Sequence, residues 1–305
     1  MAQPYVEEVV DRTAPARNLV HLRLLALQRE LLARDEEMRH QVPDAVHQAR
    51  VTCRRMRAAL GTFGVLLDPA VTGPVRFELR WAARALGDAR DAEVVHLRLT
   101  SLLDKPAVRV VGPVRLRMEG LFRARTESAD ADVAETIASP RYADLVTRLG
   151  HLVDRPSWTP ASQSAVGVAV PPLVRADFGR LERRVTRVGA STPGVEHDVA
   201  VHEVRKAAKR LRYACETVAP AYEDAATWGV EATTRITKAL GERQDTVISR
   251  RVVRGLAASA AAAGESTVTY EQLEACEERR ARECQTDFEV AWRDASGPDR
   301  WSWLG

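Results

Sequence analysis

The amino-acid sequence contains an internal repeat, and this feature constrains the fold more strongly than any other. The segment HQARVTCRRMR, which begins at His47, matches HEVRKAAKRLR, which begins at His202. Further along each half, RALGDARD from Arg84 matches KALGERQD from Lys238. Two matches in the same order and at nearly equal spacing indicate two homologous halves. The repeat therefore predicts two helical bundles in a pseudo-twofold arrangement.

The fold class follows from composition and periodicity. Aromatic residues make up 5% of the chain and hydrophobic residues 45%, with long stretches of Ala, Leu and Val that favour helices over strands. We expect an all-α protein with helices at about residues 20–41, 44–67, 75–86, 88–105, 114–136, 140–153, 173–188, 198–219, 223–240, 244–263 and 268–294. The expected organisation is an N-terminal tail (1–16), a first bundle half (17–154), a linker (155–172), a second bundle half (173–296) and a C-terminal tail (297–305).

Each copy of the first motif places a histidine and three cations on one face of a helix, within an arc of about 80°. The candidate binding residues are His47, Arg50, Arg54 and Arg57 in the first half, and His202, Arg205, Lys209 and Arg212, with the adjacent Lys206, in the second. No acid lies between His47 and Leu60, and like charges one helical turn apart repel. One interpretation is a solvated face whose arginines bond to acids of neighbouring helices. Two equivalent stripes are better explained by an anionic ligand.

The second motif extends this prediction. Arg76, Arg80 and Arg84 follow one another at every fourth position, so they form a row along one helix. The residues expected to extend the site are Arg80, Arg84 and Lys238, and the secondary candidates are Arg55, Arg76 and Arg210. Among the secondary candidates, Arg55 and Arg210 either flank the binding face or pair with acids.

Three further residues have predicted structural roles. Glu216 follows Arg212 by four positions, a spacing that allows the carboxylate to brace the guanidinium. Gly87 and Gly241 occupy the same place in the two copies of the second motif, and we expect each of them to permit a turn between helices.

Other features argue against several classes of protein. The four cysteines, which form no C-x-x-C pair and have no histidine at metal-ligand spacing, are Cys53, Cys215, Cys276 and Cys284. We expect them to be buried thiols in a reducing compartment, and we expect neither a metal nor a cofactor. The first residues contain acids and no apolar signal region, and no uncharged apolar run reaches membrane-spanning length. These features predict a soluble, cytoplasmic protein.

Four ordered segments resemble the CHAD family (conserved histidine, α-helical domain). They are HQARVTCRRMRAAL, ELRWAARALGDARD, HEVRKAAKRLRYACE and LGERQD, and the resemblance covers roughly residues 17–294. It implies two four-helix bundles that enclose a basic groove or pore, inorganic polyphosphate as the partner, the two stripes as its binding residues, and association with polyphosphate granules. Cys53 departs from the small hydroxyl residue or alanine that is common in the family. The E-x-E-x-K motif of fused triphosphatase domains has no match, which favours a stand-alone member.

Three alternatives compete with polyphosphate binding. A histidine-based phosphocarrier, or an enzyme that processes polyphosphate or triphosphate, would use His47 or His202 as nucleophile. The sequence shows neither a glycine-rich phosphate loop nor an acid pair for Mg²⁺ to accompany them. RNA binding fits the basic charge, but proteins that bind single strands stack the bases on aromatic rings. Tyr213 is the only aromatic residue in the segments HQARVTCRRMRAAL and HEVRKAAKRLRYACE. Two histidines without clustered acids also disfavour a metal site. We therefore expect a non-catalytic protein.

Overall fold

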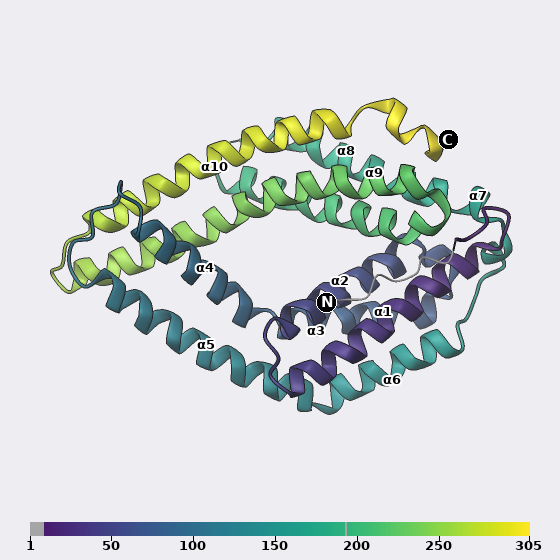
Figure 1. The fold of residues 1–305 in the computed structure, drawn as a ribbon, viewed down its shortest axis with the longest axis horizontal. Helices are drawn as coiled ribbons and strands as arrows, with labels where there is room; N and C mark the ends of the chain where they lie inside the picture. The colour runs from purple at the N-terminus through teal and green to yellow at the C-terminus, as the bar shows by residue number, and fades with distance from the viewer. Residues whose placement is uncertain (1–8, 193) are drawn as a thin grey trace.

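The computed structural model describes residues 9–192 and 194–305, and these residues fold into helices (Figure 1). The α-helices are α1 (Ala16–Arg39), α2 (Ala45–Thr62), α3 (Pro69–Ala85), α4 (Asp88–Leu103), α5 (Val114–Ala138), α6 (Pro140–Asp154), α7 (Val166–Ala169), α8 (Pro171–Gly189), α9 (Val195–Ala262) and α10 (Val268–Ala295). Short 3-10 helices are η1 (Gly64–Leu66), η2 (Pro160–Gln163) and η3 (Pro298–Leu304). Within the described ranges the only β-structure is two isolated bridges, so the predicted all-α class is confirmed.

Capping explains where the helices begin. α3 starts at Pro69 because the Asp68 carboxylate accepts a hydrogen bond from the Ala70 amide and Pro69 takes the first helical position. This helix therefore begins earlier than the expected residue 75. α6 begins in the same way, with Ser139 as its capping residue and a proline directly after it.

α9 is a single long helix with one kink rather than three separate helices. Its backbone leaves the helical region at Glu223 (φ 37°, ψ −114°), three residues after Pro220. The carbonyl groups that precede the kink are used by the N-terminal segment: Pro220 accepts from the Val10 amide at 2.9 Å, and Ala221 accepts from Arg12 Nε at 2.8 Å. The break expected near residue 220 is present. The second expected break, between residues 240 and 244, is absent because the helix continues to Ala262.

Two hydrophobic cores hold the helices together, and each uses both halves of the repeat. The larger core joins α1, α2, α3 and α6 to α8, the first part of α9 and the C-terminal η3. The smaller core joins α4 and α5 to the second part of α9 and the first part of α10. In Figure 1, α9 and α10 extend along the molecule and connect the two groups. The cores therefore do not follow the boundary between the two halves.

The predicted domain boundaries stay a prediction from the repeat. The segment expected as a linker, residues 155–172, contains η2, α7 and the start of α8. Of the expected N-terminal tail, residues 1–8 lie outside the described residues. The expected C-terminal tail is helical, and Trp301 and Leu304 are buried in the larger core.

Candidate anion-binding site

The cationic stripes of α2 and α9 meet in the structure. Arg54 on α2 lies close enough to Arg205 and Lys209 on α9 that its charge lowers the pKa of both side chains, although burial is the larger cause. Arg212 acts on the same two residues. Cations from the two halves of the repeat therefore share one electrostatic environment, even though more than a hundred residues separate them in the sequence.

Lys209 is the most strongly affected member of this cluster. Burial, followed by the charges of Arg205, Arg54 and Arg212, lowers its pKa to about 7, and Asp245 only partly opposes this effect. At neutral pH the ammonium group is therefore only partly protonated. An anion placed beside it would favour the charged form.

A cavity of about 270 Å³ lies against this cluster, between α2 and α3 on one side and α8 and α9 on the other. Its lining residues are Arg54, Arg57, Ala58, Arg76, Arg180, Arg184, Glu203, Lys206, Ala207, Lys209, Arg210 and Tyr213. Basic side chains far outnumber the one lining acid, Glu203. Six of the predicted residues line the cavity: Arg54, Arg57, Arg76, Lys206, Lys209 and Arg210.

The row on α3 adds charge to the same region. Burial lowers the pKa of Arg57, and the charges of Arg80, Arg54, Arg76 and Arg84 lower it further. Arg54 Nε is buried and has no hydrogen-bond partner among the described residues. Among the side chains that the structure describes, which exclude those of residues 88–92, no acid forms an ion pair with these five arginines. This concentration of positive charge suits an anionic ligand.

The buried Asp177 and the partly buried Glu216 hold other arginines near the cavity. Asp177 is 2% exposed and lies 2.7 Å from Arg210 Nε, while Arg210 Nη2 donates to the Gly61 carbonyl at 2.9 Å. Glu216 lies 3.2 Å from Arg55 Nε and 3.5 Å from Arg212 Nε. The predicted brace between Glu216 and Arg212 is confirmed. Of the two roles left open for Arg55 and Arg210, pairing with acids is observed for both.

Two glycines make room for stripe arginines. Arg50 Nη1 donates to the Gly87 carbonyl at 2.6 Å, and a Cβ added at Gly87 would lie 3.4 Å from Arg50 Nη2. At the corresponding place, a Cβ at Gly241 would lie 3.3 Å from Arg205 Nη2. Gly87 lies at the junction of α3 and α4, as expected. The turn expected at Gly241 was wrong, because this glycine lies inside α9 and instead allows Arg205 to pack closely.

The two histidines have different surroundings. The pKa of His202 is lowered by burial and by Lys206, a hydrogen bond with Gln244 opposes the shift, and its Nδ1 has no partner among the described residues. His47 lines another cavity, of about 530 Å³, between α1, α2 and α5. Neither histidine lines the cationic cavity, and Lys238, which is exposed on α9, does not line it either. His202 nevertheless lies near the cluster, because the charges of Lys206 and Arg205 both lower its pKa.

Repeat analysis did not identify Arg180 and Arg184, which lie on α8 and line the cationic cavity. The matching positions in the first half are Leu25 and Arg29, so only Arg184 has a basic counterpart there. Arg180 and Arg184 are four residues apart, a spacing that places both on one face of a helix, and this spacing could have identified them.

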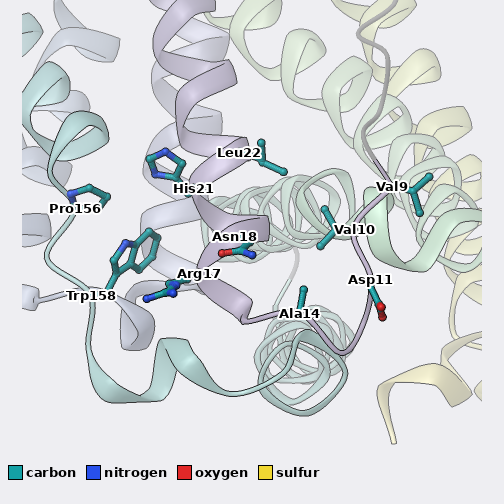
Figure 2. Close-up of a pocket in the computed structure, with 10 residues that line it drawn as sticks. All are labelled: Val9, Val10, Asp11, Ala14, Arg17, Asn18, His21, Leu22, Pro156 and Trp158. Atoms are coloured by element: carbon teal, nitrogen blue, oxygen red, sulfur yellow. The ribbon is translucent and has the colours of Figure 1, made fainter.

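A third cavity, of about 590 Å³, lies at the start of α1, and none of the predicted residues line it. Figure 2 shows Arg17, Asn18 and His21 of α1 on one wall, with Trp158 nearby. The rings of His21 and Trp158 meet edge to face, with centroids 6.3 Å apart. The lining also includes apolar residues such as Val10, so the cavity lacks the concentrated positive charge of the site between α2 and α9.

The described residues include cysteines that are mostly buried, and they contain neither a metal-binding cluster nor a membrane-spanning helix. Cys53, Cys215 and Cys284 are buried as expected, whereas Cys276 is only partly buried. Burial raises the pKa of Cys53 to about 12, so this thiol is unreactive. The described part of the chain contains no cluster of His, Cys, Asp and Glu that is arranged to hold a metal ion. Among the described helices, none combines the length and apolar character needed to cross a membrane.

Comparisons with known proteins agree on the fold. The family model of the CHAD domain matches residues 23–254 of this chain. Two proteins of Mycobacterium tuberculosis, from the CDC 1551 and H37Rv strains and both named as uncharacterized, are 32% identical over 295 residues, which is 94% of this chain. The chain spans 55% of the length of these relatives.

Two solved structures are similar to this one. PptA from Streptomyces chartreusis aligns with a TM-score of 0.77 at 22% identity, covering 92% of this chain and all of that protein. The CHAD domain from the plant Ricinus communis aligns with a TM-score of 0.65 at 19% identity, covering 100% of this chain and 97% of that domain. At these identities the similarity shows a shared fold.

Proposed function

The chain belongs to the CHAD domain family, a family linked to polyphosphate binding and processing, and we propose that it binds inorganic polyphosphate without processing it. The observation that supports this proposal best is the cluster of Arg54, Arg205, Lys209 and Arg212. These cations come from both halves of the repeat, and burial together with their mutual repulsion lowers the Lys209 pKa to about 7. A partly buried cluster of like charges is costly in the free protein, and an anionic ligand would relieve the cost.

The geometry suits a linear polyanion. Polyphosphate has no bases, so recognition depends on charge and on phosphate oxygens. The planar guanidinium groups of Arg54 and Arg57 can each bond two oxygens at once. Arg205 is held against Gly241 and is therefore positioned before the ligand arrives. Release of the counterions that surround the free polyanion adds a favourable entropy. We propose that the cavity between α2 and α9 is part of a central basic groove, and that the protein associates with polyphosphate granules in the cytoplasm.

The proposal is tested by measuring the affinity for long-chain polyphosphate in the wild type and in an Arg54→Ala, Arg57→Ala variant. We expect the double variant to bind at least about tenfold more weakly, because each arginine contributes charge-assisted hydrogen bonds. A charge-matched control is Arg123→Ala, Arg125→Ala, which removes two exposed arginines from α5. RNA added as a competitor should displace polyphosphate poorly. Equal losses in the two variants, or preferential binding of RNA, would contradict the proposal.

The non-catalytic part of the proposal needs a separate measurement. The wild-type protein is incubated with polyphosphate or ATP, with and without Mg²⁺, and assayed for released phosphate, shortened chains and an acid-labile phosphohistidine. We expect none of these products. A product that disappears in His47→Ala or His202→Ala would instead identify the histidine as a nucleophile.

A further inference from the structure

α8 presents two arginines to the cationic cavity. Arg180 and Arg184 line it together with Arg54, Arg57 and Lys209. They are one helical turn apart, so their backbones are separated by about 6 Å along α8. Their side chains are 47% and 36% exposed, whereas Lys209 is largely buried. The α8 arginines therefore lie on the solvent side of the cavity.

Both arginines are held only loosely by acids. Asp177 lies 2.7 Å from Arg210 Nε but 3.6 Å from Arg180 Nε. Glu203 lies 3.9 Å from Arg184 Nη2, while a shorter contact joins the same carboxylate to a lysine of α9. Distances of 3.6 and 3.9 Å are too long for hydrogen bonds. Arg180 and Arg184 can thus turn toward phosphate oxygens while the acids keep their closer partners.

Contacts connect the α8 pair to the row of arginines on α3. The guanidinium groups of Arg76 and Arg210 each come within 3.4 Å of the place where a Cβ on Gly61 would lie. Arg210 in turn shares Asp177 with Arg180. The cations therefore follow one another from α3, past the end of α2, to the outer face of α8.

We propose that Arg180 and Arg184 extend the anion-binding site along α8 and make the protein favour long polyphosphate chains over short ones. This inference rests on the proposed function. A short anion is satisfied by the inner cations of α2 and α9, whereas a long chain has further phosphates that pass over α8. Each additional arginine contact then adds charge-assisted hydrogen bonds and releases another counterion.

The experiment compares the wild type with an Arg180→Ala, Arg184→Ala variant, using inorganic triphosphate and a long-chain polyphosphate as the two probes. The Arg123→Ala, Arg125→Ala variant again controls for the loss of two positive charges. Both substitutions place alanine on helix surfaces, and melting curves verify that the fold persists. A long chain offers more binding positions than triphosphate, which raises its apparent affinity for every variant by the same factor. Because each variant is compared with the wild type on the same probe, this factor cancels from the ratio of affinities.

For the α8 variant we expect about a tenfold or greater loss of affinity for the long chain, and a log–log salt slope reduced by about two. The loss for triphosphate should stay within about twofold. Equal losses for both probes, or a long-chain loss no larger than that of the control, would overturn the α8 extension while leaving polyphosphate binding intact. A wild-type protein that binds neither probe would instead refute the proposed function itself.

Discussion

At the scale of single residues, Lys209 has the clearest functional consequence. Its pKa is about 7 in the folded protein, because it is buried beside Arg205, Arg54 and Arg212, compared with an ordinary value of 10.5. Between these two values the unfolded chain binds a proton that the folded protein lacks. The contribution of Lys209 to folding is therefore least favourable below pH 7 and becomes more favourable as the pH rises toward 10.5.

A bound polyanion should reverse this trend. Phosphate oxygens beside Lys209 raise its pKa, so binding takes up a proton and weakens as the pH rises from 7 to 9. The Lys209→Met variant should lose this proton uptake and bind about tenfold more weakly at pH 7. Calorimetry in buffers of different ionisation enthalpy measures the uptake, and melting curves without ligand should show that the wild type gains more stability over this pH range than the variant does.

His202 provides the control for this prediction. Burial and Lys206 lower its pKa below the ordinary value of 6.5, so its titration lies outside the window from pH 7 to 9. His202→Ala should therefore leave proton uptake at pH 8 unchanged. Uptake at pH 8 that persists in Lys209→Met but disappears in His202→Ala would assign the proton to the histidine instead.

Gly241 allows a separation of ligand binding from stability. Alanine is favoured over glycine inside a helix by about 1 kcal/mol, but a Cβ at this position would lie 3.3 Å from Arg205 Nη2. Gly241→Ala should therefore keep or raise the melting temperature while it moves Arg205 and weakens polyphosphate binding several-fold. Gly255→Ala is the control, since a Cβ there meets no atom within 4 Å. A Gly241→Ala protein with wild-type affinity would show that the position of Arg205 is unimportant.

At the scale of helices, the repeat predicted which cations share a helix face better than it predicted which side chains of other helices contact them. The H-x-x-R motifs contain Arg54, Arg205 and Lys209, which lie close together between α2 and α9, because helical periodicity specifies which residues share a face. Whether a given arginine is paired depends on acids from other helices, such as Asp177 on α8, and the period of one helix does not reveal them. Arg180 and Arg184 were missed for a related reason: Leu25 stands at the position that matches Arg180, so the basic pair is not repeated, and a comparison of halves detects only shared features. The continuity of α9 through Gly241 was also missed, because the space for Arg205 is a tertiary property.

Glu216 connects three helices through arginines. It lies 2.9 Å from Arg23 on α1, 3.2 Å from Arg55 on α2 and 3.5 Å from Arg212 on its own helix, and its side chain is 17% exposed. Glu216→Gln removes the charge that these guanidinium groups share. We expect a loss of about 2–4 kcal/mol in the free energy of unfolding, measured by urea denaturation.

The matched control for Glu216→Gln is Glu283→Gln. Glu283 also pairs with an arginine, Arg280, but its side chain is 53% exposed. Exposed ion pairs contribute about 0–1 kcal/mol, so this variant should stay near wild-type stability. Similar losses in the two variants would show that Glu216 is no more than an ordinary surface partner.

At the scale of the whole molecule, the proposed anion-binding site lies where the two halves of the chain are already packed together. The larger hydrophobic core joins α1, α2 and α3 of the first half to α8 and the first part of α9 of the second half. This core holds the cationic faces of α2 and α9 against each other despite their repulsion. Packing of the hydrophobic core thus offsets the repulsion within the cluster. A polyanion that bridges both helices should reduce this repulsion and stabilise the folded protein.

The same reasoning predicts that ligand and mutation act in opposite directions on the stability of the whole protein. Burial and four neighbouring arginines disfavour the charged form of Arg57, so Arg54→Ala, Arg57→Ala should raise the melting temperature of the free protein by a few degrees, about 2–4 °C per kcal/mol of repulsion removed. Polyphosphate at about a hundred times its dissociation constant should stabilise the wild type by about 2.7 kcal/mol, whereas the variant should gain much less. Melting curves with and without polyphosphate would then change order: the variant melts higher alone, and the wild type melts higher with ligand. A variant that melts lower than the wild type without ligand, yet gains equally from polyphosphate, would show that Arg54 and Arg57 stabilise the fold and do not bind the anion.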